Sequence, residues 1–399
     1  MNTKTPSITA SSSFVDIMEK NHMEIPWHDY TNNDSDVLIC KAGLIEKASV
    51  IGRVGLIMLS CGTGAWRVRS SMNKLSRELG VTCTVDIGLM SIEFNCFDGH
   101  DCVSQSLSIP NTGVNTSKLY RMEQFVDSFP DKEVHMTGEE IHQCLDQIEE
   151  IHTLYSPSTL GLAAALACLL KAAELIFHIS VLHEAGYICS MLFIIPGFPF
   201  ITSGIDLAKL DLRSGLERLT YSVIIVLVAT MFAWIMALIL KLQPVDFLSI
   251  HLGTGSMLVF RLLASFCGVF GFSIMFNSPV PMTATAALIG ALANTLRLEL
   301  VDLAGLPPAA AAFIGALTAG LLASAIKQYN GYPRISLTVP SIVIMVPGLY
   351  LYRAIYNFGI MSLADAVSWF AAAAMIIMAL PLGLIFARIL TDRTFRYCT

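Results

Sequence analysis

Charged residues are scarce in this sequence. Asp, Glu, Lys and Arg make up only 14% of its 399 residues, against roughly 25% in an ordinary soluble domain. The charges are also unevenly divided, because residues 1–159 carry 12 Lys/Arg and 21 Asp/Glu, whereas residues 160–399 carry 13 and 10. This composition argues against a single soluble globule, and we expect an acidic water-soluble part followed by a membrane part. Nucleic acid is a poor candidate partner for so acidic a chain.

Motifs for catalysis and metal binding are also lacking. The sequence contains no Walker lysine, no H-E-x-x-H and no G-x-S-x-G, and no paired carboxylates or nucleophile with a base can be recognised. Its ten cysteines include no C-x-x-C pair and no zinc spacing, so we interpret them as reduced, mostly buried thiols. We therefore predict no enzyme, no metal and no cofactor, and an intramembrane enzyme is disfavoured.

Long uncharged runs dominate the second part. A membrane-spanning helix needs about 20 largely apolar residues, and clean runs of that length are found at 219–240, 303–326 and 366–387. The run 262–296 is too long for one span and is cut by NSPVP, so it predicts two helices. Broken or weaker candidates are the runs at 160–182, 185–205 and 335–352. The total is about eight spans.

The two Pro-Gly segments suggest an internal duplication. IIPGFPFITSG and VPSIVIMVPGLYLY each precede a clean hydrophobic run, and in the expected topology they run in opposite directions. Discontinuous helices in inverted repeats are typical of secondary transporters, although Pro and Gly also kink helices merely for packing. Lys and Arg are more frequent in the loops on one side, which predicts an even number of spans with both termini in the cytoplasm. The N-terminus, MNTKTPSITASSSF, lacks the apolar run of a secretory signal and agrees with that side.

The first part predicts a small α+β domain. Residues 36–80 have apolar residues at helical spacing, interrupted at Gly62 to Gly64, which indicates two helices. Residues 81–97 predict one long strand or a hairpin that ends at a turn. Further helices are expected near 117–129 and 137–154, and the second begins with a capping box. The four basic residues of the second helix form either an anion or lipid site or, as we favour, a solvated face: Arg67, Arg69, Lys74 and Arg77.

Several motifs resemble the threonine/serine exporter family. They are GTGAWRVRSSMNKLSRELGV, GVNTSKLYRMEQFV, IIPGFPFITSGIDLAKLDLRSGLERL, FNSPVPMTATAALIGALANTLR and VPSIVIMVPGLYLYRAIY. The resemblance implies a cytoplasmic N-terminal domain, an inner-membrane transporter domain, and export of small hydroxylated amino acids driven by the proton gradient. Here both halves are fused, and the stretch before Pro196 is short by about one helical hairpin. Thr202, Ile205 and Arg69 also depart from the family pattern.

Polar residues inside the apolar runs are the candidates for transport, because charges in hydrocarbon are costly. Lys171, Glu174 and His178 share one helical face and form either a proton relay or a solvated interfacial strip. Asp206 matches the aspartate of the family and either accepts a substrate ammonium or proton, or caps the helix that follows the break. Thr202 either binds a substrate hydroxyl or satisfies freed carbonyls.

The remaining candidates lie at the breaks or beyond them. Arg261 and Arg353 are placed to bind a substrate carboxylate, although Arg261 also has the option of snorkelling to the surface. Tyr352 and Asn357 add polar groups after the second Pro-Gly break, next to Arg353. The alternative for the tyrosine is an anchor at the membrane interface. The break residues themselves complete the set: Pro196, Gly197, Pro347 and Gly348.

The sequence thus predicts a multi-pass α-helical membrane protein with about eight spans and inverted-repeat character, preceded by a small α+β cytoplasmic domain. We expect a flexible N-terminus at 1–35 and a cytoplasmic domain at 36–157. Two membrane halves follow at 158–241 and 257–390, and a cytoplasmic tail at 391–399. We predict a proton-driven exporter of threonine and serine in the inner membrane, whose partners are the amino acid, the proton and membrane lipid. A homo-oligomer is left open. The alternative is a non-transporting relative that serves as a regulatory or assembly partner.

Overall fold

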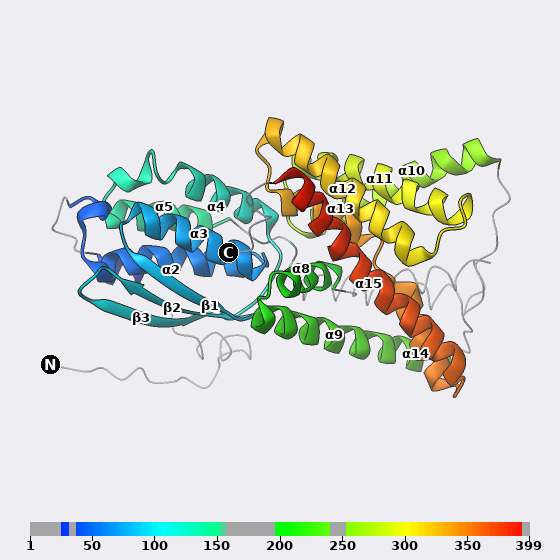
Figure 1. The fold of residues 1–399 in the computed structure, drawn as a ribbon. Helices are drawn as coiled ribbons and strands as arrows, with labels where there is room; N and C mark the ends of the chain where they lie inside the picture. Colours follow the sequence, from blue (N-terminus) through cyan, green and yellow to red (C-terminus); the bar gives the residue numbers. More distant parts are fainter. Residues whose placement is uncertain are drawn as a thin grey trace, which may run out of the picture.

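The computed structural model describes residues 25–31, 37–151, 153, 155, 196–239 and 253–392. Figure 1 shows an α+β part at one end of the molecule and a bundle of long helices at the other, with α8 between them. The division agrees with the charge asymmetry of the sequence. The two parts are called the N-terminal domain and the membrane part below.

Four α-helices and a small sheet form the described part of the N-terminal domain. Helices α2 (Leu44–Ser60) and α3 (Ala65–Glu78) are separated at Gly62 to Gly64, as predicted. Gly62 has a φ of 80° there, a conformation that glycine adopts readily. The remaining helices are α4 (Thr116–Ser128) and α5 (Gly138–Glu149), together with the short 3₁₀ turns η1 (Trp27–Tyr30), η2 (Ile39–Lys41) and η3 (Glu133–His135). The predicted capping box of α5 is present between Thr137 and Glu140.

The sheet contains three antiparallel strands in sequential order, β1 (Thr82–Ile87), β2 (Ser91–Phe97) and β3 (Cys102–Ser108). Residues 81–97 form a hairpin, one of the two predicted alternatives. The third strand was not predicted, because only Val103 and Leu107 of CVSQSLS supply the inward apolar side chains. The inner face of the sheet packs on α2, where Gly52 leaves room for the Phe94 ring. The prediction of mostly buried thiols is wrong for the described cysteines, since Cys102 and Cys267 are exposed and only Cys61 and Cys96 are buried.

Eight described helices form the membrane part: α8 (Gly197–Ala208), α9 (Leu212–Ile239), α10 (Thr254–Met275), α11 (Val280–Asp302), α12 (Pro308–Asn330), α13 (Arg334–Val343), α14 (Gly348–Gly359) and α15 (Leu363–Thr391). Five of them are long and apolar enough to cross a membrane, and the pair α13 and α14, bent by 45°, is a sixth candidate. The predicted breaks between α10 and α11 and between α13 and α14 are both present. The predicted span at 160–182 and most of that at 185–205 lie outside the described residues.

Small residues bring the membrane helices close together. Gly320 of α12 faces Ala387 of α15, and a Cβ on Gly383 of α15 would meet the backbone oxygen of Phe313. Large apolar side chains instead point outward, as Phe232 and Phe370 do with exposures of 65% and 55%. In water such a surface would be costly, whereas in a bilayer it contacts lipid tails. The exposed pattern therefore agrees with a protein that spans a membrane.

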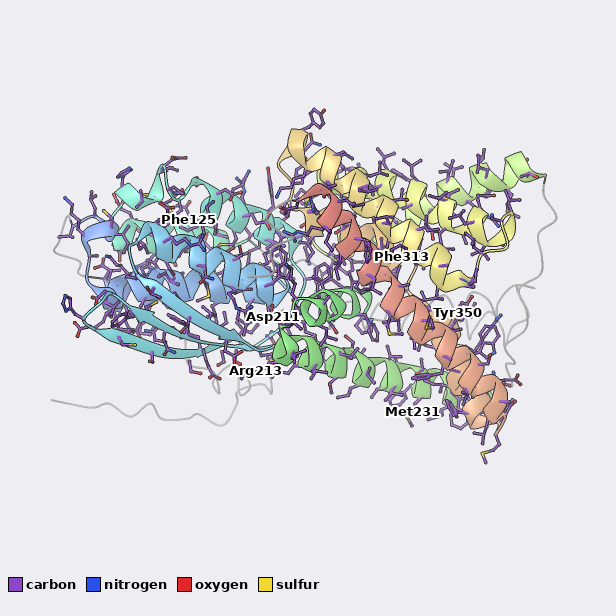
Figure 2. All side chains as sticks on the ribbon, in the orientation of Figure 1. Phe125, Asp211, Arg213, Met231, Phe313 and Tyr350 are labelled. Atoms are coloured by element: carbon purple, nitrogen blue, oxygen red, sulfur yellow. The ribbon has the colours of Figure 1, made fainter. Side chains whose placement is uncertain are left out.

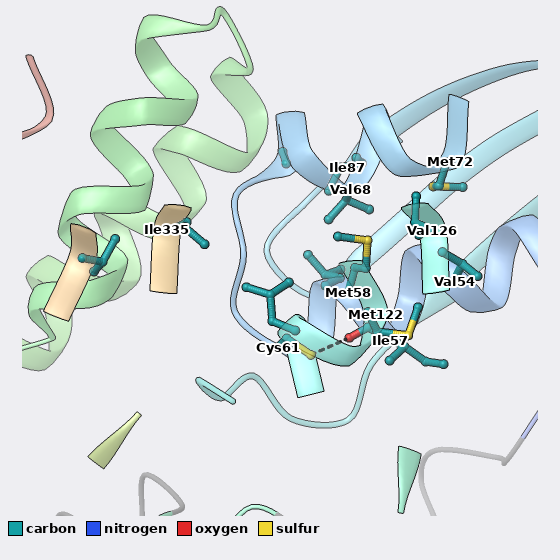
Figure 3. Packing of buried hydrophobic residues seen from close by; sticks show 14 of the residues in the cluster. Val54, Ile57, Met58, Cys61, Val68, Met72, Ile87, Met122, Val126 and Ile335 are labelled. Atoms are coloured by element: carbon teal, nitrogen blue, oxygen red, sulfur yellow. Dashed lines mark hydrogen bonds between the residues drawn. The ribbon is translucent and has the colours of Figure 1, made fainter. Parts of the chain in front are cut away.

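One hydrophobic core continues through both parts of the molecule. The buried cluster that contains Val68 and Met72 of α3 also contains Phe198 of α8 and Ile335 of α13. Figure 3 shows Ile335 across from the core residues of the N-terminal domain, where the Cys61 thiol donates to the Ile57 carbonyl. The N-terminal domain is thus packed firmly against the membrane helices.

Candidate functional site

Asp206 lies at the contact between the N-terminal domain and α8 and is fully buried. One carboxylate oxygen accepts the backbone N–H of Ala65, at 3.0 Å, and the other accepts the Ser214 hydroxyl, at 3.0 Å. Arg218 Nε lies 3.4 Å from the same second oxygen. Ala65 is the first residue of α3, where unbonded N–H groups and the helix dipole favour a negative charge. Asp206 therefore caps a helix, but that helix belongs to the other domain and is not the one that follows the break.

Arg218 completes this contact from α9. Its guanidinium, which is 4% exposed, donates to the carbonyl oxygens of Gly62 at 3.1 Å and Thr63 at 2.7 Å. A Cβ on Gly64 would stand 2.6 Å from the Asp206 carboxylate, so only glycine permits this approach. Two of the motifs that carry the family resemblance, GTGAWR and GIDLAKLDLRSGLERL, thus form the two sides of one interface.

Further ion pairs, one partly buried and the others exposed, surround this buried contact. Figure 2 places Asp211 and Arg213 where α8 and α9 meet the sheet. Asp211 pairs with Arg69, and Arg213 pairs with Asp86 and, at 3.2 Å, with Glu93. The favoured interpretation of the basic residues of α3 as a solvated face is wrong for Arg67, which is 9% exposed and paired with Glu123. The sequence could not reveal these partners, because each lies far away along the chain.

The two Pro-Gly breaks have the same local geometry. Pro196 and Pro347 precede α8 and α14 with φ, ψ of −77°, 68° and −81°, 55°, and each helix is 12 residues long. Both helices end before a left-handed residue at the same spacing, Leu210 and Met361, each with φ 62°. A long apolar helix then follows each of them, α9 or α15. The described residues therefore contain one structural unit twice.

The two units run in opposite directions and meet at their breaks. The end of α8 contacts the N-terminal domain through Asp206, whereas the last residue of α14, Gly359, contacts Trp234 near the far end of α9. A Cβ on Gly197, the first residue of α8, would stand 3.0 Å from Val343, the last residue of α13. Neither proline caps its helix with a side chain. Gly348 N–H of α14 donates to the Val346 carbonyl at 2.8 Å, and Pro199 of α8 has no N–H. The other first-turn N–H groups of the two half-helices have no acceptor within their own helix.

Arg297 is a candidate that the sequence reasoning missed. Its Nε is buried without a hydrogen-bond partner among the described residues. A Cβ on Gly315 would meet both Met345, just before the second break, and Arg297, at 3.2 and 3.3 Å. Tyr350, in the first turn of α14, lies close enough to Arg297 to interact electrostatically. A positive charge beside a helix break is informative inside a membrane, but the sequence showed only a basic residue near a loop.

Other predicted residues have protein partners. Arg261 bonds Glu299 at 2.8 Å and also pairs with Asp302, across the α10–α11 hairpin. Arg353 lies over the Trp369 ring, with Cζ 4.7 Å from its centroid. The structure therefore holds both arginines at the end of the bundle away from the N-terminal domain.

The remaining predicted residues fall into three groups. Asn357 donates to the Arg353 carbonyl at 2.8 Å, and Tyr352 is buried. Thr202 donates to the Phe198 carbonyl at 3.1 Å, whereas the hydroxyl of its neighbour Ser203 is buried without a partner in the described part. Three candidates lie outside the described residues: Lys171, Glu174 and His178.

A polar cluster at the far end of the N-terminal domain has a different character. His142 is fully buried, and Ser49 Oγ lies 3.0 Å from its Nε2. Burial, followed by the charge of Arg53, lowers the pKa of His142 to about 4. A hydrogen bond to Glu139 raises the pKa of the nearby His28. No group of three or more His, Cys, Asp or Glu residues that could hold a metal is found among the described residues.

Comparison with known families bears on this arrangement. A family model described as a threonine/serine exporter, ThrE, matches residues 49–173 and 169–241. A second, described as "Threonine/Serine exporter, ThrE", matches residues 261–390. Among the curated proteins and the solved structures, nothing matches the chain. The matches cover the N-terminal domain from residue 49 onward, both Pro-Gly breaks, and the interface between this domain and α8.

Proposed function

Because the chain belongs to the threonine/serine exporter family, we propose that it is a secondary transporter that exports threonine, serine or similar small amino acids. One observation carries the proposal. The two matching half-helix units run in opposite directions and meet at Gly197 and Val343. Inverted units with broken helices are typical of transporters, whose substrate sites lie where the breaks meet.

The substrate carboxylate is bound at this meeting point. Two half-helix N-termini offer N–H groups and positive dipole ends to an anion. Arg297, beside the second break, supplies a guanidinium that suits a carboxylate in two-point contact. The ammonium of the substrate finds acceptors in backbone carbonyls that the breaks release. The buried, unpartnered Ser203 hydroxyl on α8 is the candidate for sensing a substrate hydroxyl.

The coupling ion is the proton, and Asp206 is its acceptor. Protonation would neutralise the carboxylate that holds Ala65 N–H and faces Arg218. The hydrogen bond from Ala65 and the ion pair with Arg218 are both stronger with a charged carboxylate, so protonation weakens the contact between the N-terminal domain and α8. The contact between Asp206 and the N-terminal domain thus restricts movement of α8, and protonation of Asp206 releases this restriction. Glu174 and His178, with Lys171, remain proposed as a relay in the same pathway.

The inner membrane is the proposed location, with both termini in the cytoplasm. Basic residues near the N-terminal domain support this orientation, because positive charges are retained on the cytoplasmic side. Among the described residues, the ends of α8, α9, α12, α13 and α15 that face the N-terminal domain in Figure 1 carry six basic residues: Lys209, Arg213, Arg218, Lys327, Arg334 and Arg388. The opposite halves of α10 and α14 carry only Arg261 and Arg353.

Threonine efflux from dipeptide-loaded cells tests the proposal. We expect efflux from cells that express the chain, collapse of efflux with a protonophore, and loss of most of it in Asp206→Asn and Arg297→Gln. Arg261→Gln is the matched control, because its guanidinium already bonds Glu299 and Asp302, and it should retain efflux. No efflux from a protein shown to be in the membrane would contradict transport and favour the regulatory alternative.

A further inference from the structure

Four basic side chains from four different helices converge beside the interface of the two parts. Arg67 comes from α3, Lys327 from the last turn of α12, Arg334 from the start of α13 and Arg388 from the last turn of α15. Arg67 and Arg388 flank the Trp66 ring, with Cζ 5.1 and 4.0 Å from its centroid. Lys327 is close enough to interact electrostatically with all three arginines. Like charges repel at such distances, so their convergence calls for an anion.

The carboxylates of the described residues do not balance this cluster. Glu123 pairs with Arg67, and Asp392 lies 3.5 Å from Arg388 Nε. Asp127 acts on Arg67 and Lys327 at longer range, so three carboxylates face four cations. No carboxylate in the described part of the chain pairs with Arg334, and its Nη1 is buried without a hydrogen-bond partner. Arg67 is more than nine-tenths buried, yet its Nε has no partner in the same part. Burial, followed by the repulsive charge of Arg388, lowers the pKa of Arg67 to about 9.

A hollow of about 40 Å³ opens between the three arginines of the cluster. One water needs roughly 10–15 Å³ on the same measure, so the hollow accepts a compact head group and not a large molecule. Trp66, Arg67, Arg334 and Arg388 line its polar side. Ile205 and Leu384 line the other side, which leaves an apolar wall next to the charges.

We propose that this hollow is a binding site for a phosphate group, separate from the amino-acid pathway. Guanidinium groups bind phosphate through paired N–H···O bonds, and several of them suit the oxygens of a phosphate better than the two oxygens of a carboxylate. The group comes either from an anionic phospholipid, whose chains would follow the apolar wall, or from a soluble phosphate compound. Basic pockets between membrane helices are known to hold anionic head groups. Bound phosphate joins α3 of the N-terminal domain to α13 and α15 of the membrane part.

Thermal unfolding of the purified full chain in nanodiscs tests the site and separates the two sources. In discs of zwitterionic lipid, inorganic phosphate is titrated against chloride at equal ionic strength. In a second arm, phosphatidylglycerol is added to the discs. A rise of several degrees in the unfolding midpoint with inorganic phosphate indicates a soluble phosphate compound, and a rise with phosphatidylglycerol alone indicates the lipid head group.

The variant Arg334→Gln identifies the hollow as the place of binding. Its Nη1 has no hydrogen-bond partner in the described part of the chain, and its guanidinium would lose only the longer-range attraction of Asp392, so the variant should fold. Its affinity for the active ligand should fall about ten-fold, as expected for one charge-assisted bond. Arg213→Gln removes an exposed, carboxylate-paired arginine and should respond like the wild type. Arg334→Lys keeps the charge without the fork and should fall between them. No midpoint shift in either arm, or an equal shift in Arg334→Gln and the wild type, would overturn the proposal.

Discussion

Replacing Arg218 by methionine should destabilise the protein strongly. The guanidinium faces Asp206 at 3.4 Å and donates to two backbone carbonyls, at 3.1 and 2.7 Å, from a position that is 4% exposed. Methionine has a similar length but no donors, so the variant leaves a buried carboxylate without its cation and two carbonyls without donors. Loss of one partner of a buried ion pair costs about 3–5 kcal/mol. We therefore expect the free energy of unfolding to fall by about that amount.

The matched control is Arg213→Met. Arg213 lies five residues earlier in α9 and also joins the N-terminal domain, but its side chain is 41% exposed. An exposed pair of this kind contributes about 1 kcal/mol or less. Chemical denaturation of the full chain in detergent gives both values, and the difference between them measures the effect of burial.

A double variant isolates the interaction with Asp206. Asp206→Asn removes the negative charge but keeps an oxygen that can accept the Ala65 N–H. Arg218→Met together with Asp206→Asn should therefore be less destabilised than the sum of the single variants, because no unpaired charge remains. If Arg218→Met costs no more than Arg213→Met, the reasoning about a buried pair at this interface is refuted.

Three further expectations concern other positions. The pKa of His142 is lowered to about 4 from an ordinary 6.5, so the unfolded chain binds a proton at this residue before the folded chain does. The free energy of unfolding should therefore fall by about 3 kcal/mol at most as the pH drops from 6.5 to 4. Unfolding midpoints at pH 7.5 and 4.5 should differ less in His142→Gln than in the wild type. Gly62→Ala should cost about 1–3 kcal/mol, since φ is 80° and the new Cβ would stand 2.5 Å from the Gly113 oxygen; an unchanged midpoint would contradict this. Gly197→Val should abolish efflux while the protein remains in the membrane, because even a Cβ stands 3.0 Å from Val343; efflux at the wild-type rate would exclude the meeting of the breaks as the pathway.

Local signals account for the parts of the fold that the sequence predicted. Uncharged runs of sufficient length identified α9, α12 and α15, and NSPVP and the second Pro-Gly segment located the breaks, because proline removes a donor from the helix ladder. The capping box identified the start of α5 for a similar reason. The third strand escaped because its seven residues carry only a weak alternating pattern.

Contacts between distant segments account for what the sequence could not reveal. Asp206 was recognised as a candidate, but its acceptance of the Ala65 N–H joins residues 141 positions apart. Arg67 looked like a solvated residue because nothing nearby in the sequence shows that α13 and α15 cover it. Arg297 was overlooked because only the folded bundle shows that its Nε has no described partner. Candidate chemistry was thus readable residue by residue, whereas its pairing was not.

The shared core also constrains how the protein is made. A ribosome releases the N-terminal domain first, yet Phe198 and Ile335, which complete its buried cluster, are synthesised much later. At about 5–20 residues per second, the interval between Met72 and Ile335 lasts from roughly ten seconds to nearly a minute. During that time the surface of the newly made N-terminal domain that later contacts the membrane helices, including the Gly62 to Gly64 loop, stays uncovered. The buried cluster of the N-terminal domain is therefore completed only after the later membrane helices have been synthesised.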